Sequence, residues 1–243
     1  MALAVAAGAA QLAYPLSNPR LLHSVAIAAV GLFLAASVTH AVVHHGVGWA
    51  AGLVVITAGG GLGAEALGVR TGYPFGQHTY AGTLGLQLLG VPIVVAAMWT
   101  MMAYPAFVLA RRLVADTTAL AVPIVGAIAL SAWDLFLDPQ MVAAGHWSWA
   151  QPTPSVPGEG GIPLTNLAGW LLVSVALMTL LELVLPGDHA PIGVPAALYV
   201  WTWAVSVLAN LVFFHRPGVA LAGGVGMGLI ALPVLWSLWD SRP

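Results

Sequence analysis

The chain has 243 residues, of which 60% are hydrophobic and only 6% are charged, and its formal net charge is −2. An ordinary soluble domain has about a quarter of its residues charged, so this composition excludes a soluble fold and predicts that lipid surrounds most of the surface. The chain contains no Cys and no Lys, which excludes disulfides, Cys-ligated metal centres and a retinal Schiff base. Nothing in the sequence supports nucleic-acid binding.

The first stretch, Ala2–Leu12, is rich in Ala and is followed by Tyr14-Pro15. It lacks the basic start of a signal peptide. We expect it to form a short interfacial helix, with an eighth membrane span as the alternative.

Seven apolar runs follow, and each is long enough to cross a membrane: Leu21–Val43, Trp49–Leu67, Leu84–Ala110, Thr118–Leu137, Leu167–Leu185, Ile192–Phe214 and Val219–Leu238. In lipid the backbone must satisfy its own hydrogen bonds, so each run is predicted to be helical. The sequence therefore predicts an all-α, polytopic transmembrane helical bundle of about seven spans, eight if the first stretch also crosses. We expect residues 1–243 to form a single integral membrane domain, located in the cell membrane.

Two segments differ from the rest by their polar and aromatic content. Glu65–Tyr80 follows the second run, and Trp133–Asn166 begins at the end of the fourth run. Ends that are two spans apart lie on the same side of a membrane. The sequence thus predicts that these two segments meet at one mouth of the bundle.

Three carboxylates belong to these segments. Asp134 and Asp138 are four residues apart, so they share a helix face, and Pro139 predicts that the helix ends at Asp138. Glu65 is just inside the end of its own span. Acids at this depth are costly unless they are paired, protonated or next to a wet cavity, and burial can keep one carboxyl protonated beside an ionised neighbour. The three carboxylates are candidates for a paired general acid and general base. Alternatively, Arg70 neutralises one acid and the others cap helices.

Aromatic residues and histidines allow two interpretations each. The aromatic residues near this mouth either form an interfacial belt or line a site where they would stabilise a cation; they are Tyr73, Phe75, Tyr80, Trp133, Trp147 and Trp149. The pattern His40-x-x-x-His44-His45 resembles one box of the membrane di-iron hydroxylases and desaturases. It lies at the opposite end of the first span from the acidic segments, and the other five histidines stand singly.

The polar motifs together resemble those of the carotenoid biosynthesis membrane-protein family, which contains the bisanhydrobacterioruberin hydratase and gamma-carotene 1'-hydroxylase type enzymes. The motifs are Tyr14-Pro15-Leu16, Glu65-x-x-Gly68-x-x-x-Gly72-x-Pro74-Phe75-Gly76, Trp133-Asp134-x-x-x-Asp138-Pro139-Gln140-Met141, Gly145-His146-Trp147-x-Trp149 and Gly161-Ile162-Pro163-x-x-Asn166-x-x-Gly169-Trp170. One position departs from the family pattern, because His78 stands where an aromatic residue, usually Tyr, is expected.

The resemblance implies a hydro-lyase that adds water across the terminal 1,2 double bond of an acyclic carotenoid end and gives a tertiary alcohol, without a cofactor or metal. Glu65, Asp134 and Asp138 are then the expected catalytic residues, with Asp134 or Glu65 donating the proton and Asp138 positioning water. The expected substrate-binding residues are Arg70, Tyr73, Phe75, His78, Tyr80, Trp133, His146, Trp147, Trp149 and Asn166. Expected partners are the acyclic carotenoid, membrane lipid and other carotenoid pathway enzymes. A di-iron hydroxylase and a non-enzymatic carotenoid carrier or proton-coupled transporter remain as alternatives.

Overall fold

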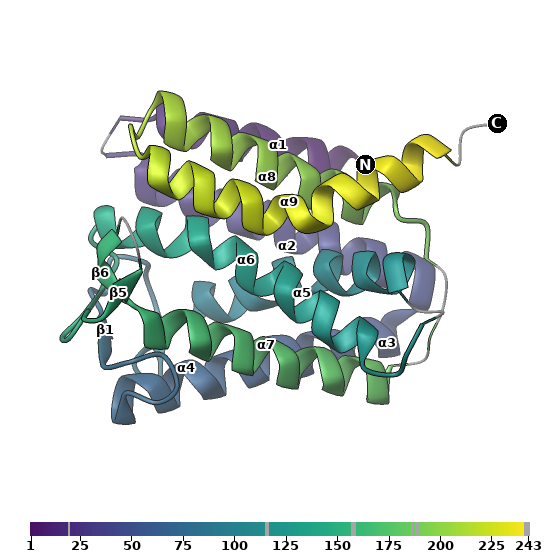
Figure 1. The fold of residues 1–243 in the computed structure, drawn as a ribbon, viewed down its shortest axis with the longest axis horizontal. Coiled ribbons are helices and arrows are strands. Elements are labelled where there is room, and N and C mark those ends of the chain that lie inside the picture. The colour runs from purple at the N-terminus through teal and green to yellow at the C-terminus, as the bar shows by residue number, and fades with distance from the viewer. Residues whose placement is uncertain (19, 115–116, 157–158, 186, 188–189, 241–243) are drawn as a thin grey trace.

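The computed structural model describes the chain except residues 19, 115–116, 157–158, 186, 188–189 and 241–243. Long helices lie side by side, and short strands gather at one end of the bundle (Figure 1). Seven helical stretches are long and apolar enough to cross a membrane. They are α2 (Leu22–His45), the continuous stretch α3 (Val47–Val54), η2 (Val55–Gly59) and α4 (Gly60–Thr71), then α5 (Ile93–Val114), α6 (Ala121–Ala143), α7 (Leu164–Val184), α8 (Gly193–Val212) and α9 (Pro217–Asp240). The predicted all-α bundle with seven spans is confirmed.

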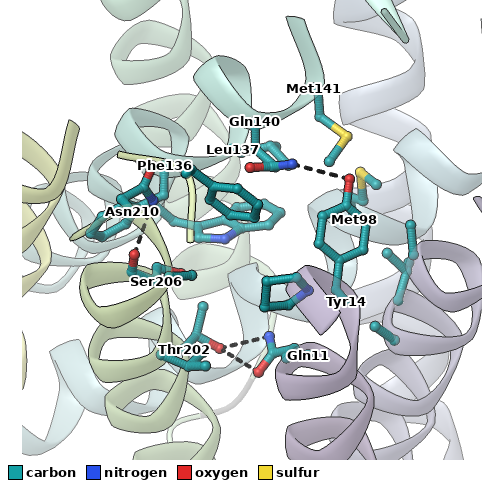
Figure 2. A pocket seen from close by; sticks show the side chains of 18 of the residues that line it. Gln11, Tyr14, Met98, Phe136, Leu137, Gln140, Met141, Thr202, Ser206 and Asn210 are labelled. Atoms are coloured by element: carbon teal, nitrogen blue, oxygen red, sulfur yellow. Dashed lines mark hydrogen bonds between the residues drawn. The ribbon is translucent and has the colours of Figure 1, made fainter. Parts of the chain in front are cut away.

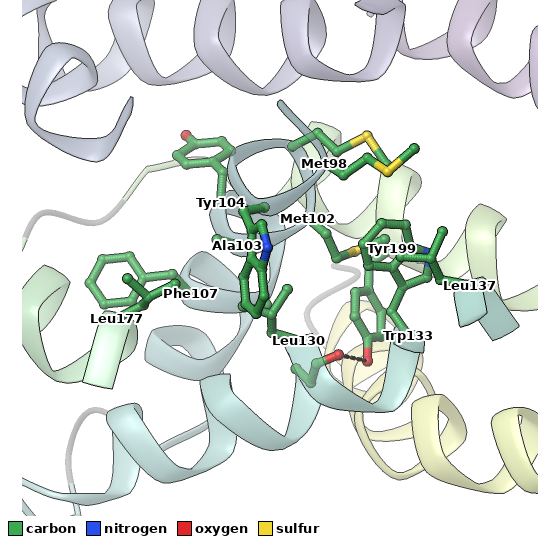
Figure 3. Packing of buried hydrophobic residues seen from close by; sticks show 14 of the residues in the cluster. Met98, Met102, Ala103, Tyr104, Phe107, Leu130, Trp133, Leu137, Leu177 and Tyr199 are labelled. Carbon is green, nitrogen blue, oxygen red and sulfur yellow. Dashed lines mark hydrogen bonds between the residues drawn. The ribbon is translucent and has the colours of Figure 1, made fainter. Parts of the chain in front are cut away.

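The centre of the bundle consists of α5 and α6. In the most apolar part of α5, 83% of the residues are buried, against 28% for the Val47–Thr71 stretch, whose remaining surface faces outward. Large side chains of α5 meet those of α6, α7 and α8 in the core, and the hydroxyl of Tyr199 donates to the carbonyl of Ala129 at 3.0 Å (Figure 3). The charged and polar residues of α6 are therefore held inside a tightly packed core.

The N-terminal helix differs from both expectations for it. Helix α1 (Ala2–Ala13) and the short η1 (Tyr14–Leu16) are too short for a span. However, α1 packs lengthwise against α2 and α8, with Ala7 and Gly8 buried (Figure 1). It is a partial helix of the bundle rather than an interfacial one.

Two predicted helix ends are wrong. The run from Leu84 becomes helical only at Ile93, because β2 (Gln87–Leu88) and β3 (Val91–Pro92) first form a hairpin. At the other site, Pro139 does not end α6, which continues to Ala143. Pro is tolerated inside membrane spans, and α6 continues past it; the Pro139 carbonyl also accepts from Arg216 at 3.0 Å. Asp138 is therefore inside a helix and not at its end.

The second span contains a π-helical turn, η2, between α3 and α4. Its Thr57 hydroxyl bonds the Leu53 carbonyl at 2.7 Å and the Thr100 hydroxyl at 2.8 Å, which ties this turn to α5. Such single turns carry one extra residue and are frequent at functional sites. Helix α4, which follows it, contains Glu65.

Close packing of α4 on α5 depends on a glycine. A Cβ atom at Gly61 would overlap the side chain of Trp99, whereas one at Gly63 would meet no atom of the described chain within 4 Å. We expect Gly61→Ala to destabilise the protein by about 1–3 kcal/mol, the usual cost of overpacking, seen as a lower melting temperature in detergent. Gly63→Ala is the matched control on the same helix, and an equal loss in both variants would contradict this account.

Candidate active site

The two polar segments meet at one end of the bundle. Strand β1 (His78–Tyr80) pairs antiparallel with β4 (Trp147–Trp149), so that His78 lies opposite Trp149 and Tyr80 opposite Trp147. The remaining strands, β5 (Ser155–Val156) and β6 (Glu159–Pro163), form a second hairpin that leads into α7. The convergence predicted from the sequence is confirmed, and the strand pair fixes the two segments relative to each other.

Glu65 accepts two hydrogen bonds and makes one ion-pair contact. Its Oε2 accepts from the Tyr80 hydroxyl at 2.9 Å and lies 3.3 Å from Nε2 of His78, and its Oε1 accepts from Trp99 Nε1 at 3.3 Å. The Glu65 side chain is almost fully buried. The Glu65 side chain is therefore held in one orientation by groups from β1 and α5.

Asp134 and Asp138 form a pair through one amide. Nδ2 of Asn166 donates to Oδ2 of Asp134 at 3.1 Å and also to Oδ2 of Asp138, and Trp147 Nε1 donates to Oδ1 of Asp138 at 3.0 Å. Both aspartates are 3% exposed. Oδ1 of Asp134 is buried and has no hydrogen-bond partner among the described residues. Two buried acids that share one donor in this way are suited to hold a proton between them.

A small cavity joins the two acidic groups. Glu65, Asp138 and Asn166 line it, and its volume of about 20 Å³ is enough for one water molecule. Aromatic rings make most of the remaining wall: Phe75, Tyr80, Trp99, Trp147, Trp149 and Trp170. The cavity thus places a water-sized space between carboxyl groups and ring faces.

His78, when protonated, forms an ion pair with Glu65. Burial alone lowers the pKa of an imidazole, but the hydrogen bond and the charge of Glu65 outweigh burial and raise the His78 pKa above 6.5. Burial and the charge of Glu65 also raise the Tyr80 pKa well above its ordinary value, so Tyr80 stays protonated and can donate to Glu65.

The raised His78 pKa predicts a pH dependence of stability. Its protonated form contributes stability that is fully present below the unfolded-state pKa of 6.5 and is lost as the pH rises through the higher folded-state pKa. We expect the melting temperature to fall as the pH is raised from about 6 to about 9, and His78→Tyr to flatten this fall. His215→Gln, at an exposed histidine, is the control; a slope unchanged by His78→Tyr would contradict the prediction.

Some predicted site residues lie away from the cavity. Arg70 and Tyr73 are exposed at and just beyond the end of α4. His146 is buried against His23, with ring centroids 5.0 Å apart, and its Nδ1 bonds the Thr83 hydroxyl at 2.7 Å; burial and His23 lower its pKa. Trp133 faces a neighbouring chamber instead. Phe75, His78, Tyr80, Trp147, Trp149 and Asn166 all line the cavity.

Two tryptophans at the cavity were not among the predicted site residues. Trp99 and Trp170 stack with ring centroids 4.1 Å apart and an interplanar angle of 15°. Trp99 lies in the middle of an apolar run, where sequence alone gives no sign that its indole N–H meets Glu65. Trp170 belongs to a family motif quoted above, which was the available signal.

A larger apolar chamber adjoins the cavity. It has a volume of about 150 Å³ and lies between α1, η1, α2, α5, α6 and α8 (Figure 2). Met98 and Leu137 line both spaces. These two side chains therefore border both the chamber and the acidic cavity.

The histidine box lies at the far end of the bundle. Helix α2 is 24 residues long, begins near His146 and ends at His45. Its length corresponds to roughly 36 Å. Nδ1 of His40 bonds the Tyr104 hydroxyl at 2.7 Å. Within the described ranges, no three His, Asp or Glu side chains are grouped as a metal site would require.

Comparisons with known proteins show the family to which the chain belongs. The family described as "Carotenoid biosynthesis protein" matches residues 23–233. A bisanhydrobacterioruberin hydratase from Haloarcula japonica is 38% identical over 122 residues, which cover 48% of this chain and 39% of the relative. The chain thus matches well under half the length of that curated relative. No solved structure matches.

Proposed function

The chain belongs to the carotenoid biosynthesis protein family, and from this premise we propose that it is a carotenoid hydratase, an integral enzyme of the cell membrane that adds water to the end of an acyclic carotenoid. The observation that carries the proposal is the cavity where Glu65 and Asp138 face a water-sized space walled by aromatic rings. The hydratase from Haloarcula japonica supports the reaction type.

The two adjoining spaces suit such a substrate. A carotenoid is a long hydrocarbon, and the chamber lined mainly by apolar residues of η1, α2, α5, α6 and α8 offers room for its end. Movement of Met98 and Leu137 would let the terminal double bond reach the acidic cavity. Membrane lipid would surround the rest of the carotenoid. A neighbouring carotenoid pathway enzyme could deliver the carotenoid to the chamber.

Hydration of a trisubstituted double bond proceeds in two steps. A carboxyl group transfers a proton to the less substituted carbon, C2, and the π electrons form the new C–H bond, which leaves a tertiary cation at C1. Water then bonds to C1, and its excess proton passes to a base. The product is a tertiary alcohol, and because no electrons are gained or lost overall, the reaction needs no cofactor.

The contacts favour an assignment different from the one suggested by the sequence. Asp138 faces the cavity and is paired with Asp134 behind it, so we assign the proton donor to this pair, acting through Asp138. Glu65, which Tyr80, Trp99 and His78 hold in place, then binds the water and accepts its proton. Return of that proton from Glu65 to Asp138 within the shared cavity restores the starting state.

The aromatic wall contributes to the cation step. Ring faces can stabilise a nearby cation by about 0.5–2 kcal/mol each. Trp99 and Trp170 present a stacked pair, and Trp147 and Trp149 stand on β4. They also limit the cavity to about one water, which protects the cation from side reactions.

Labelled water tests the proposal. Cells that make an acyclic carotenoid are grown in ¹⁸O-labelled water with and without the protein, and their pigments are measured by mass spectrometry. We expect a new product heavier by one water that carries the solvent label. A hydroxyl without the label would show oxygenase chemistry instead, and an unchanged pigment in cells containing folded protein would favour a carrier.

A further inference from the structure

The chamber beside the acidic cavity has polar groups that an unmodified hydrocarbon would not use. Gln11 Nε2 donates to the Thr202 hydroxyl at 3.1 Å, Gln140 Nε2 donates to the Tyr14 hydroxyl at 3.1 Å, and Asn210 Nδ2 donates to the Ser206 carbonyl at 2.9 Å (Figure 2). The rest of the lining is mainly apolar.

Two acceptors remain after these bonds are made. Oδ1 of Asn210 and Oε1 of Gln140 are buried and have no hydrogen-bond partner among the described residues. Asn210 is only 3% exposed. An unsatisfied buried acceptor costs about 1–3 kcal/mol, so a chamber that holds two of them is suited to receive a donor.

The orientation of the Asn210 amide is fixed by its own helix. If the amide were turned over, Oδ1 would face the Ser206 carbonyl, and two acceptors would repel each other. The Gln140 amide is less constrained, because the Tyr14 hydroxyl can donate as well as accept. Asn210 is therefore the residue on which the inference depends.

We propose that this chamber binds the hydroxylated end of an apolar isoprenoid chain, with Oδ1 of Asn210 accepting the hydrogen bond of the hydroxyl group. A hydroxyl fits because it supplies one donor, while the carbons around it contact the apolar wall. Met98 and Leu137 connect this site with the acidic cavity. The inference rests on the proposed function in one respect, namely that the reaction produces a tertiary alcohol on such a chain.

The hydroxyl has two possible sources, the product just formed or a substrate that already carries a hydroxyl group. Both present the same chemistry to Asn210. A product bound here would inhibit hydration of the hydrocarbon, whereas a hydroxylated substrate bound here would be hydrated faster than the hydrocarbon.

Equilibrium binding tests the site directly. The probes are an acyclic carotenoid with a tertiary hydroxyl at one end and the same hydrocarbon without the hydroxyl. Binding of each probe is measured by the quenching of tryptophan fluorescence. The measurements use the Asp138→Asn variant in detergent, so that neither carotenoid is hydrated during the experiment. We expect the hydroxylated probe to bind about tenfold more tightly. Adding Asn210→Leu or the smaller Asn210→Ala should remove this preference while hydrocarbon binding remains.

Ser174→Ala, at a buried serine whose hydroxyl bonds Ser131 instead, is the control and should keep the preference. Equal affinity for both probes, or a preference that survives both Asn210 replacements, would overturn the proposal. Failure of the hydratase proposal is distinguishable, because it appears as absence of labelled alcohol in the growth experiment and leaves the binding preference unaffected. Rates and inhibition with the two carotenoids in the unsubstituted protein then identify the source of the hydroxyl.

Discussion

Asp138→Asn is expected to lower the rate of hydration by about 10²–10⁴-fold, the usual contribution of a positioned acid or base. Asn has nearly the same shape as Asp, and its one amide oxygen can keep the bond from either Trp147 or Asn166. What the variant loses is the proton that the double bond needs. The measurement is the amount of ¹⁸O-labelled alcohol formed per amount of purified protein in detergent.

Glu182→Gln provides the control for a lost carboxylate. Glu182 pairs with Arg111 Nε at 2.9 Å, and it belongs to α7 near the end opposite the cavity. Its replacement should leave hydration within a few fold of the original rate. Unimpaired hydration by folded Asp138→Asn protein would remove Asp138 from the mechanism.

Glu65→Gln should cause a loss of similar size, about 10²–10⁴-fold, for a different reason. A neutral amide cannot take the proton of the attacking water, and it no longer balances a protonated His78. Tyr80→Phe keeps the carboxylate and removes one of its donors, so its effect should be smaller, near the 10-fold that corresponds to one hydrogen bond.

The order of these two effects is the informative result. Rates are compared in the same detergent assay, together with melting temperatures that separate lost chemistry from lost folding. If Tyr80→Phe were as inactive as Glu65→Gln, the tyrosine and not the glutamate would be the group that handles the proton.

The fold could be predicted because its largest signals are local. Each span is a run of about 20 apolar residues, and composition alone excludes a soluble alternative. The errors arose where tertiary contacts overrule local preference. Pro139 is a helix-ending signal in isolation, but in the protein α6 continues past it and Arg216 bonds its carbonyl. The β2–β3 hairpin was hidden in an apolar run because its side chains resemble those of a span.

The candidate site was predictable in location but only partly in detail. Counting spans placed the two polar segments at one mouth, and the i, i+4 spacing placed Asp134 and Asp138 on one face. Sequence could not show which polar residues point outward, so Arg70 and Tyr73 were expected in a site from which they are absent. Nor could it show that Trp99, from a different span, donates to Glu65. The roles of the three carboxylates stay a proposal.

The π-helical turn in the second span sets the rotational phase of everything after it. One residue of an α-helix corresponds to about 100° of rotation, so the extra residue of η2 turns α4 by that amount relative to an uninterrupted helix. With this turn in place, Glu65 is buried and accepts from Tyr80 and Trp99. A one-residue deletion within Val55–Gly59 that closes the wide turn into an ordinary α-helical turn would keep Glu65 facing its donors, so this part of the span tolerates a change of length that elsewhere in the helix would rotate the carboxylate.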